Sequence, residues 1–123
     1  MIRKSSKEEV KNCGFNPEAH TVGFSMDGDY YVYELGQKIV STIRVRTVNG
    51  KKLIEGVYTS PQYRHRGIMH LLLNHVINVE YPNDTLFAHC LISSKRIFED
   101  CGFVHYHTVF YKHGTQYFMR LDR

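Results

Sequence analysis

Cysteines are few, and their spacing excludes the usual cysteine-based sites. The chain has three, Cys13, Cys90 and Cys101, which are scattered and odd in number. The lack of a Cys-x-x-Cys pair argues against a zinc knuckle, and an odd, scattered set argues against a disulfide framework. We therefore expect reduced thiols that act as small, mostly buried apolar side chains.

Long apolar runs are also missing. No run approaches the roughly 18 to 20 residues that a membrane-spanning helix needs, and the charged segment after Met1 lacks the apolar core of a signal peptide. The sequence contains no internal repeat, low-complexity segment or linker. We therefore expect one domain over residues 1–123, in a cytoplasmic protein that does not bind a membrane.

The composition that remains is typical of a soluble globular protein. Hydrophobic residues make up 42% of the chain and charged residues 23%, which argues against disorder. The formal net charge is +4, and there are eight histidines. This balance favours anionic ligands, either a nucleotide-like cofactor or a nucleic acid.

Residues 53–79 are the most informative stretch. β-formers up to Thr59 predict a strand in which Glu55, Val57 and Thr59 share one face. Pro61 ends that strand because it has no N–H to donate to a ladder. Apolar residues at helical spacing between Ile68 and Ile77 then predict an amphipathic helix whose apolar stripe lies in the core.

A basic turn, Gln62–Gly67, joins this strand to this helix. The first turn of a helix binds anions, because its backbone N–H groups are free and its dipole is positive there. Gly67 lets a ligand approach the main chain, and Arg64 and Arg66 add guanidinium donors suited to phosphate. His65 can assist when it is protonated. The sequence therefore predicts a pyrophosphate site.

Upstream of this stretch the sequence predicts mainly β-structure. A serine cap at Ser5 or Ser6 starts a short helix that ends near Asn12. A brief strand over Thr21–Met26 and a turn at Asp27–Asp29 follow. Three β-rich runs, residues 30–35, 38–48 and 51–59, are joined by Gly36-Gln37 and by Asn49-Gly50, a strong hairpin signal. These runs should form an antiparallel meander.

Downstream, Leu86–Ile92 is an almost continuous apolar run, which is typical of a strand buried on both faces and parallel to its predecessor. Ser93 is expected to cap a helix over Ser94–Asp100 that ends at Gly102. Residues 103–111 and 115–121 predict two more strands. The expected fold is α/β (α+β): a central mixed, mostly antiparallel sheet with one parallel crossover, flanked by helices.

The run Val57-x-Thr59-x-Pro61-x-Tyr63-Arg64-x-Arg66-Gly67-Ile68 resembles the acetyl-CoA signature of the GNAT superfamily of N-acyltransferases. The core of that signature is Gln/Arg-x-x-Gly-x-Gly/Ala, with Arg64 in the first position and Gly67 in the fourth. Met69 replaces the expected small residue. The order of the predicted elements also matches the GNAT core, so the resemblance implies a GNAT-like domain.

A second GNAT motif, Asn-x-x-Ala-x-x-x-Tyr-x-x-x-Gly-Phe, is matched at its Gly102-Phe103 end and by the small Ser94. Leu91 stands at the asparagine position and Phe98 at the tyrosine. In many members that tyrosine protonates the departing thiolate of coenzyme A, and Phe98 has no hydroxyl with which to do so. A thiol of pKa near 8.5 can leave as a thiolate, with assistance from water or Tyr58.

The resemblance implies transfer of an acetyl group from acetyl-CoA to a primary amine, by direct attack in a ternary complex. Glu55 is the expected base and Tyr58 a lesser catalytic candidate, as is Glu34; otherwise Glu55 is a carboxylate on a solvated face, paired with Arg44 or Arg46. The acceptor would be a protein lysine or N-terminus, or a small amine, and a homodimer fits the family. The expected cofactor-binding residues are Val57, Tyr58, Thr59, Arg64, His65, Arg66, Gly67, Ile68, Met69, Ser94 and Phe98.

Three other interpretations remain open from the sequence. His105 and His107 share a predicted strand face, but no acidic or cysteine partner stands at metal spacing, so we expect no metal site. Aromatic Tyr30, Tyr31 and Tyr33 with Arg44 and Arg46 could contact single-stranded nucleic acid, although alternate strand tyrosines usually face a core. The alternative function, which Met69 and Phe98 favour, is a GNAT-fold binding module of weak or no activity that engages a protein or a nucleic acid.

Overall fold

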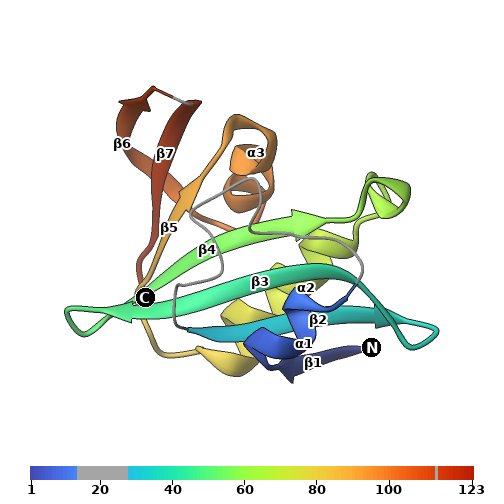
Figure 1. Ribbon diagram of the computed structural model, residues 1–123. Helices are drawn as coiled ribbons and strands as arrows, with labels where there is room; N and C mark the ends of the chain where they lie inside the picture. Colours follow the sequence, from blue (N-terminus) through green and yellow to red (C-terminus); the bar gives the residue numbers. More distant parts are fainter. Residues whose placement is uncertain (14–27, 113) are drawn as a thin grey trace.

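The computed structural model describes residues 1–13, 28–112 and 114–123. Seven strands of this described part form one sheet in the order β1-β2-β3-β4-β5-β7-β6 (Figure 1). The predicted strand over Thr21–Met26 and the predicted turn residue Asp27 lie outside the described residues. Within the described ranges, no helix is long and apolar enough to span a bilayer.

The first four strands form an antiparallel array. Strand β2 covers Asp29–Leu35, β3 covers Lys38–Val48 and β4 covers Lys51–Thr59, so the predicted meander is confirmed. Asn49 and Gly50 both have positive φ, of 50° and 77°, as a type I′ hairpin turn requires. Strand β1, Ile2–Ser5, was not expected from the sequence and pairs with the outer edge of β2.

A helical crossover links β4 to β5, Leu86–Cys90, and the two strands run parallel as predicted. Helix α2 covers Ile68–His75 and continues as a π-helical segment over Val76–Glu80. The expectation that β5 is buried on both faces was wrong: only alternate residues of β5 are fully buried. Residues Phe87 and His89 lie on its more open face.

The two faces of the sheet carry separate clusters of buried side chains. On the first face, α2 and α3, Ile92–Asp100, pack against β3, β4, β5 and β7 around residues such as Ile43, Leu72 and Phe98. On the second face, Val10 of α1, Lys7–Lys11, packs against Tyr30 and Val32 of β2. Figure 1 shows α1 and α2 on opposite sides of the sheet.

Helix ends follow local chemistry, with one correction. The Ser6 side chain accepts a hydrogen bond from the Glu9 N–H and caps α1, as predicted. Helix α3 begins at Ile92 after Leu91, without a side-chain cap, so the prediction that Ser93 caps it was wrong. Its other end is as expected: Gly102 has φ of 96°, and the Gly102 and Phe103 N–H groups bond back to Glu99 and Phe98.

The last two strands, β6 over Val104–Tyr111 and β7 over Gly114–Leu121, form a hairpin whose β7 side continues the sheet beyond β5. Strand β6 is the edge of the sheet, and most of its side chains are exposed. Helix α3 packs against this half of the sheet, β5, β7 and β6 (Figure 1).

Candidate active site

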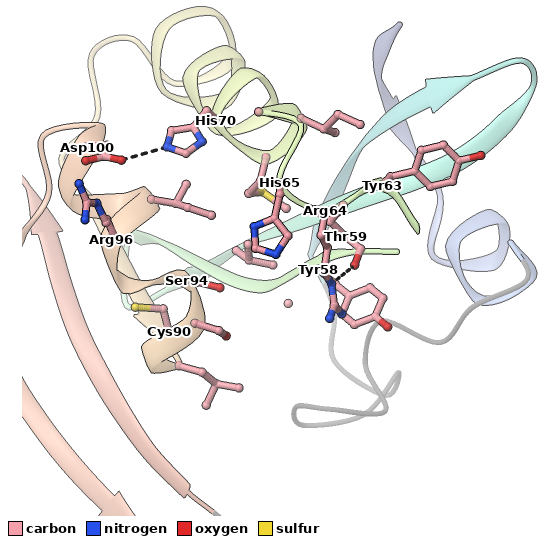
Figure 2. Close-up of a pocket in the computed structure, with 18 of the residues that line it drawn as sticks. Tyr58, Thr59, Tyr63, Arg64, His65, His70, Cys90, Ser94, Arg96 and Asp100 are labelled. Carbon is pink, nitrogen blue, oxygen red and sulfur yellow. Dashed lines mark hydrogen bonds and ion pairs between the residues drawn. The ribbon is translucent and has the colours of Figure 1, made fainter. Parts of the chain in front are cut away.

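A pocket opens where β4 and β5 separate. The two strands pair only at Lys52–Leu86, Leu53–Phe87 and Ile54–Ala88. Beyond Ile54 they diverge (Figure 1), and the residues at the end of each strand line a pocket of about 920 Å³. Its walls come from the end of β4, the turn after it, the start of α2, the end of β5 and the first turns of α3 (Figure 2).

A β-bulge at Gly56 changes which side chains of β4 face this pocket. Gly56 has φ of 63°, and the register with β3 shifts so that Arg44 pairs with Glu55 while Thr42 pairs with Tyr58. Cross-strand partners share a face, so Glu55 and Tyr58 lie on the second face, together. The prediction that Glu55, Val57 and Thr59 share one face was therefore wrong: Val57 packs against the core of the first face.

The basic turn is held in place by its own backbone and by Arg64. Residues Pro61–Tyr63 form a single 3₁₀ turn, and Arg64 donates from Nε to the Thr59 carbonyl at 2.9 Å. Its guanidinium also lies 5.2 Å from the centre of the Tyr58 ring. His65 and Gly67 both have positive φ, and a Cβ built on Gly67 would meet no heavy atom within 4 Å. The N-terminus of α2 therefore faces open space.

The structure brings most of the predicted cofactor residues to this pocket. Arg66 is an exception, because it is exposed and lies over the Tyr63 ring at 5.5 Å without lining the pocket. Phe98 is another: it is fully buried and packs edge-on against Phe103 in the core. The predicted residues that do line the pocket are Val57, Tyr58, Thr59, Arg64, His65, Gly67, Ile68, Met69 and Ser94.

Met69, which the GNAT signature does not expect, does not project into solvent at this turn. It is 7% exposed and belongs to the main core cluster around Leu72 and Val76. Only a small part of it borders the pocket, so a bulky side chain here is accommodated on the core side of α2.

The far wall of the pocket carries groups that sequence reasoning did not select. Arg96 and Ile97 of α3 line it, and His70 of α2 contacts Asp100 at 3.0 Å across the two helices. Figure 2 shows this pair at the opposite end of the pocket from Tyr58 and Arg64, with His65 between them. Cationic side chains therefore stand at both ends of the opening.

Glu55 lies just outside the pocket, in an ionic cluster on the second face. Its Oε1 accepts from Arg44 Nη2 at 3.1 Å and from Arg46 Nε at 2.9 Å. Pairing with Arg44 or Arg46 was anticipated, and Glu55 pairs with both. The face is not solvated, however: the Glu55 side chain is 12% exposed and that of Arg44 only 1%. Glu34, the other carboxylate considered, bonds to Arg3 at the far edge of the sheet, away from the pocket.

His89 of β5 completes this cluster, and it was missed from the sequence. Its Nδ1 lies 3.8 Å from Glu55 Oε2, and its ring stacks on Phe118 with 3.8 Å between centroids. Burial lowers the pKa of His89, and the charge of Arg46 adds to that effect while Glu55 opposes it. A signal was available: His89 is the one basic residue within the apolar run Leu86–Ile92.

Cys90, the next residue, also lines the pocket but lacks the character of a nucleophile. Burial raises the pKa of its thiol to about 12, so the thiolate is scarce at neutral pH. Cys90 and Cys101 both carry free thiols; Cys90 is buried and Cys101 is partly buried.

Two further sequence interpretations can be compared with the structure. His105 and His107 do not share a face, because a bulge between them pairs His105 with Met119 and His107 with Phe118. Across the described ranges, no group of three His, Cys, Asp or Glu side chains is arranged to hold a metal ion. Tyr30, Tyr31 and Arg44 are at most 3% exposed, so they cannot form the aromatic and basic face proposed for nucleic acid.

The geometry suits a long ligand that has an anionic group at one end and an extended polar chain attached to it. A helix N-terminus with an open glycine and adjacent cations fits a phosphate. The unpaired edge of β4 beyond Ile54 fits an extended polar chain that needs a hydrogen-bonding partner. At the point of divergence, Tyr58 and His89 provide a hydroxyl and an imidazole at the pocket wall.

Comparison with known proteins gives a consistent result. A family model described as an acetyltransferase (GNAT) domain matches residues 26–105, more than half of the chain. No curated protein sequence gives a significant match.

Solved structures share the fold at low sequence identity. Escherichia coli ElaA is similar with a TM-score of 0.76 and 12% identity, covering 99% of each chain. A ribosomal-protein-alanine N-acetyltransferase from Brucella melitensis is similar with a TM-score of 0.74 and 17% identity, covering 98% of each chain. A spermidine N-acetyltransferase SpeG chimera from Vibrio cholerae and hSSAT is similar with a TM-score of 0.72 and 14% identity, covering 98% of this chain and 95% of that one.

The family model matches the central part of the chain. That part contains the diverging strands β4 and β5 and the glycine turn at the start of α2. The chain belongs to the GNAT superfamily of acetyltransferases.

Proposed function

We propose that this acetyltransferase transfers the acetyl group of acetyl-CoA to a primary amine by direct attack within a ternary complex. The observation that carries the proposal is the divergence of β4 and β5 beyond Ile54, which opens a pocket beside the free N-terminus of α2. Acetyl-CoA supplies an activated thioester, and the residues described below supply binding, orientation and proton transfer.

Diphosphate binding is assigned to the turn before α2. The amides at the start of α2 have no partner within the helix, and Gly67 leaves them accessible. Arg64 lines the same opening and supplies positive charge, and His65 adds an imidazole to it. Arg66 is not part of this assignment, because its guanidinium lies over Tyr63 and does not line the pocket.

The backbone of β4 is assigned to the pantetheine arm and to the thioester oxygen. The Gly56 and Tyr58 carbonyls accept hydrogen bonds from Thr42 and Ser41 of β3. Peptide groups alternate in direction along a strand, so those of Val57 and Thr59 turn toward the pocket. An N–H placed where negative charge develops on the thioester oxygen would be the main catalytic contribution.

The acceptor amine is assigned to the second face of the sheet, where Tyr58 and His89 line the pocket. Its class is a primary amine, either a protein lysine or N-terminus or a small amine. Relatives of the same fold are named for both kinds of substrate, a ribosomal-protein alanine and spermidine. Tyr58, one of the hydroxyl-bearing residues that line the pocket, is our candidate for returning a proton to the departing thiolate, because Phe98 has no hydroxyl.

Titration calorimetry with acetyl-CoA and two variants of Gly67 tests the assignment. Gly67 has φ of 75°, so Gly67→Ala and Gly67→Glu both carry backbone strain of about 1–2 kcal/mol. Only Gly67→Glu adds a carboxylate next to the diphosphate. We expect Gly67→Ala to weaken binding modestly and Gly67→Glu to weaken it more than about 100-fold, with similar melting temperatures for the two variants. Failure of the wild-type protein to bind at millimolar acetyl-CoA would refute the proposal.

The alternative is a binding module on the same fold that binds acetyl-CoA without turnover. The observation that favours it is the absence of a hydroxyl at Phe98, whose ring is fully buried. An assay of free thiol release, run against peptides, polyamines and aminoacyl-tRNA, separates the two functions. Turnover on any of these amines supports the enzyme, whereas binding without turnover on all of them supports the module.

A further inference from the structure

We propose that His89, rather than Glu55, takes the proton from the acceptor amine, and that Glu55 orients and stabilises His89 as a positioning residue. This inference rests on the proposed acetyl transfer and adds its general base. It assigns separate tasks to the two residues that stand at the point where β4 and β5 part.

The topology places the two side chains together. Ile54 and Ala88 are the last paired residues of β4 and β5, and Glu55 and His89 follow them directly. Both lie on the second face of the sheet, and Glu55 Oε2 is 3.8 Å from His89 Nδ1. His89 lines the pocket and Glu55 does not. The imidazole therefore stands between the carboxylate and the space that a substrate would enter.

Two neighbours favour one orientation of the imidazole: Phe118 by stacking and Glu55 by charge, across 3.8 Å, which is longer than a hydrogen bond. Its ring stacks on Phe118 of β7 with an interplanar angle of 12°. Its Nδ1 edge faces the Glu55 carboxylate, which favours the tautomer with the proton on Nδ1. Nε2 is then the proton-accepting nitrogen, and no residue in the described part of the chain forms a hydrogen bond with it. A base needs such a free, directed lone pair.

Glu55 is poorly suited to be the base itself. Its Oε1 already accepts two charge-assisted hydrogen bonds, from Arg44 and from Arg46. Protonating the carboxylate would weaken both interactions and leave the almost fully buried Arg44 beside a neutral group. As an anion fixed in this way, Glu55 instead stabilises the imidazolium that forms when His89 accepts a proton.

The charges around His89 keep it neutral before the reaction. Burial lowers its pKa, and Arg46 of β3 lowers it further, while Glu55 of β4 raises it. Arg44 of β3 faces the same carboxylate, Tyr58 lies on the same face of β4, and Phe118 of β7 covers the ring. At neutral pH the imidazole is therefore ready to accept a proton rather than already charged.

Acetyl transfer through His89 conserves protons and electrons. An alkylammonium gives one proton to His89 Nε2 and becomes a neutral amine with a free electron pair. That pair forms the C–N bond to the thioester carbon, the C–S bond breaks, and the sulfur leaves with its bonding pair. The nitrogen releases its second proton to solvent, and the thiolate takes up one proton from water or from Tyr58. His89 then returns its proton to solvent.

The test compares His89→Gln with His107→Gln. His107 also contacts the Phe118 ring, at 5.5 Å, but it is exposed and does not line the pocket, so it is a matched control. Steady-state kinetics on the best amine are measured between pH 5 and 9, together with calorimetry on acetyl-CoA. We expect His89→Gln to lower kcat by about 10²- to 10⁴-fold, with acetyl-CoA affinity changed less than about threefold, and His107→Gln to stay near wild type.

The pH dependence distinguishes positioning by Glu55 from a purely structural role. In the wild type, kcat should fall on the acidic side, with a limb below the ordinary histidine pKa of about 6.5. His89→Gln should abolish that limb. Glu55→Gln should move it to lower pH, because the carboxylate that raises the His89 pKa has been neutralised. A structural role alone would lower the melting temperature and leave the limb in place.

Failures of the two proposals look different. If the wild-type protein releases no thiol with any amine, acetyl transfer fails and the assignment of His89 fails with it. If the wild type turns over and His89→Gln keeps more than about one third of kcat with the same acidic limb, His89 is not the base and acetyl transfer stands. Loss of acetyl-CoA binding in His89→Gln would also overturn the assignment, because it would show a role in cofactor binding.

Discussion

The two faces of the sheet differ in what their buried residues are. Under α2 and α3 the buried cluster is apolar, with Ile43, Leu72 and Phe98 among its members. On the second face, near the point where β4 and β5 diverge, the buried and half-buried residues are Arg44, Glu55 and His89. Strands β3, β4 and β5 therefore bury aliphatic side chains on one side and ionisable ones on the other.

This difference separates two tasks within the same three strands. Apolar burial supplies stability without direction, at about 25 cal/mol per Å². Buried charges contribute little net stability, because their desolvation offsets their attraction. They do fix orientation, which is what a proton-transfer group needs. We expect substitutions of first-face core residues that do not line the pocket, such as Phe98, to act on folding alone. Substitutions in the ionisable cluster of the second face should act on folding and on catalysis.

Phe98→Ala should have the largest effect on folding. The ring is fully buried and packs against Phe103, so its loss should destabilise the protein by about 3–5 kcal/mol. Phe110→Ala on the exposed edge strand is the control, and it should change stability by less than about 0.5 kcal/mol. Urea unfolding measures both. At a temperature where Phe98→Ala is folded, its acetyl-CoA affinity should match that of the wild type. A large loss of affinity would show that Phe98 contributes to cofactor binding.

Glu55→Ala comes next, at about 3 kcal/mol, because it leaves the nearly fully buried Arg44 without this carboxylate. Glu55→Gln keeps an oxygen that can accept from both arginines, so it should cost about half as much. Chemical unfolding at pH 7 gives both values. Equal costs for the two variants would mean that charge, rather than hydrogen bonding, holds the cluster.

The sequence was sufficient to predict the order of most elements. The boundary between β3 and β4 follows from the Asn49-Gly50 turn, since few residues other than Gly and Asn adopt the positive φ values needed. At the start of β3, Gly36 follows the same rule, whereas Gln37 has φ of 66°, which its residue type does not predict. The turn before α2 was also predictable, because its residues act locally. Strand β1 was not, since Ile2–Ser5 has little apolar pattern and is held by pairing with β2.

The facing of individual side chains was the part that local patterns could not predict. Alternation along a strand fails at a bulge, and the bulges at Gly56 and between His105 and His107 depend on pairing with another strand. Regular alternation along the strand predicted that Glu55 shares a face of the sheet with Val57, whereas in the structure it shares a face with Tyr58. His89 was missed for a related reason: its neighbours Glu55 and Phe118 come from strands far away in sequence.

Glu9 at the rim of the second face should show the smallest effect, and it tests whether burial explains the cost of breaking the Glu55 cluster. The Arg3 guanidinium, assisted by the Ser5 hydroxyl, lowers the pKa of Glu9 to about 2. The Glu9 side chain is 41% exposed, however, so solvent screening reduces the contribution of this pair to less than about 1 kcal/mol. Glu9→Gln should therefore destabilise the protein by less than that at pH 7.

The sign of the pH dependence follows from the lowered pKa of Glu9. Because the folded-state pKa lies below the unfolded value, the stabilisation is complete above about pH 5 and is lost as the pH falls toward 2. Urea unfolding of wild type and Glu9→Gln at pH 7 and pH 3 should give a small difference that shrinks with acidity. A difference above about 2 kcal/mol at pH 7 would make this exposed pair as costly to break as the buried one. Burial would then no longer explain why the charges on the second face behave differently from those at its rim.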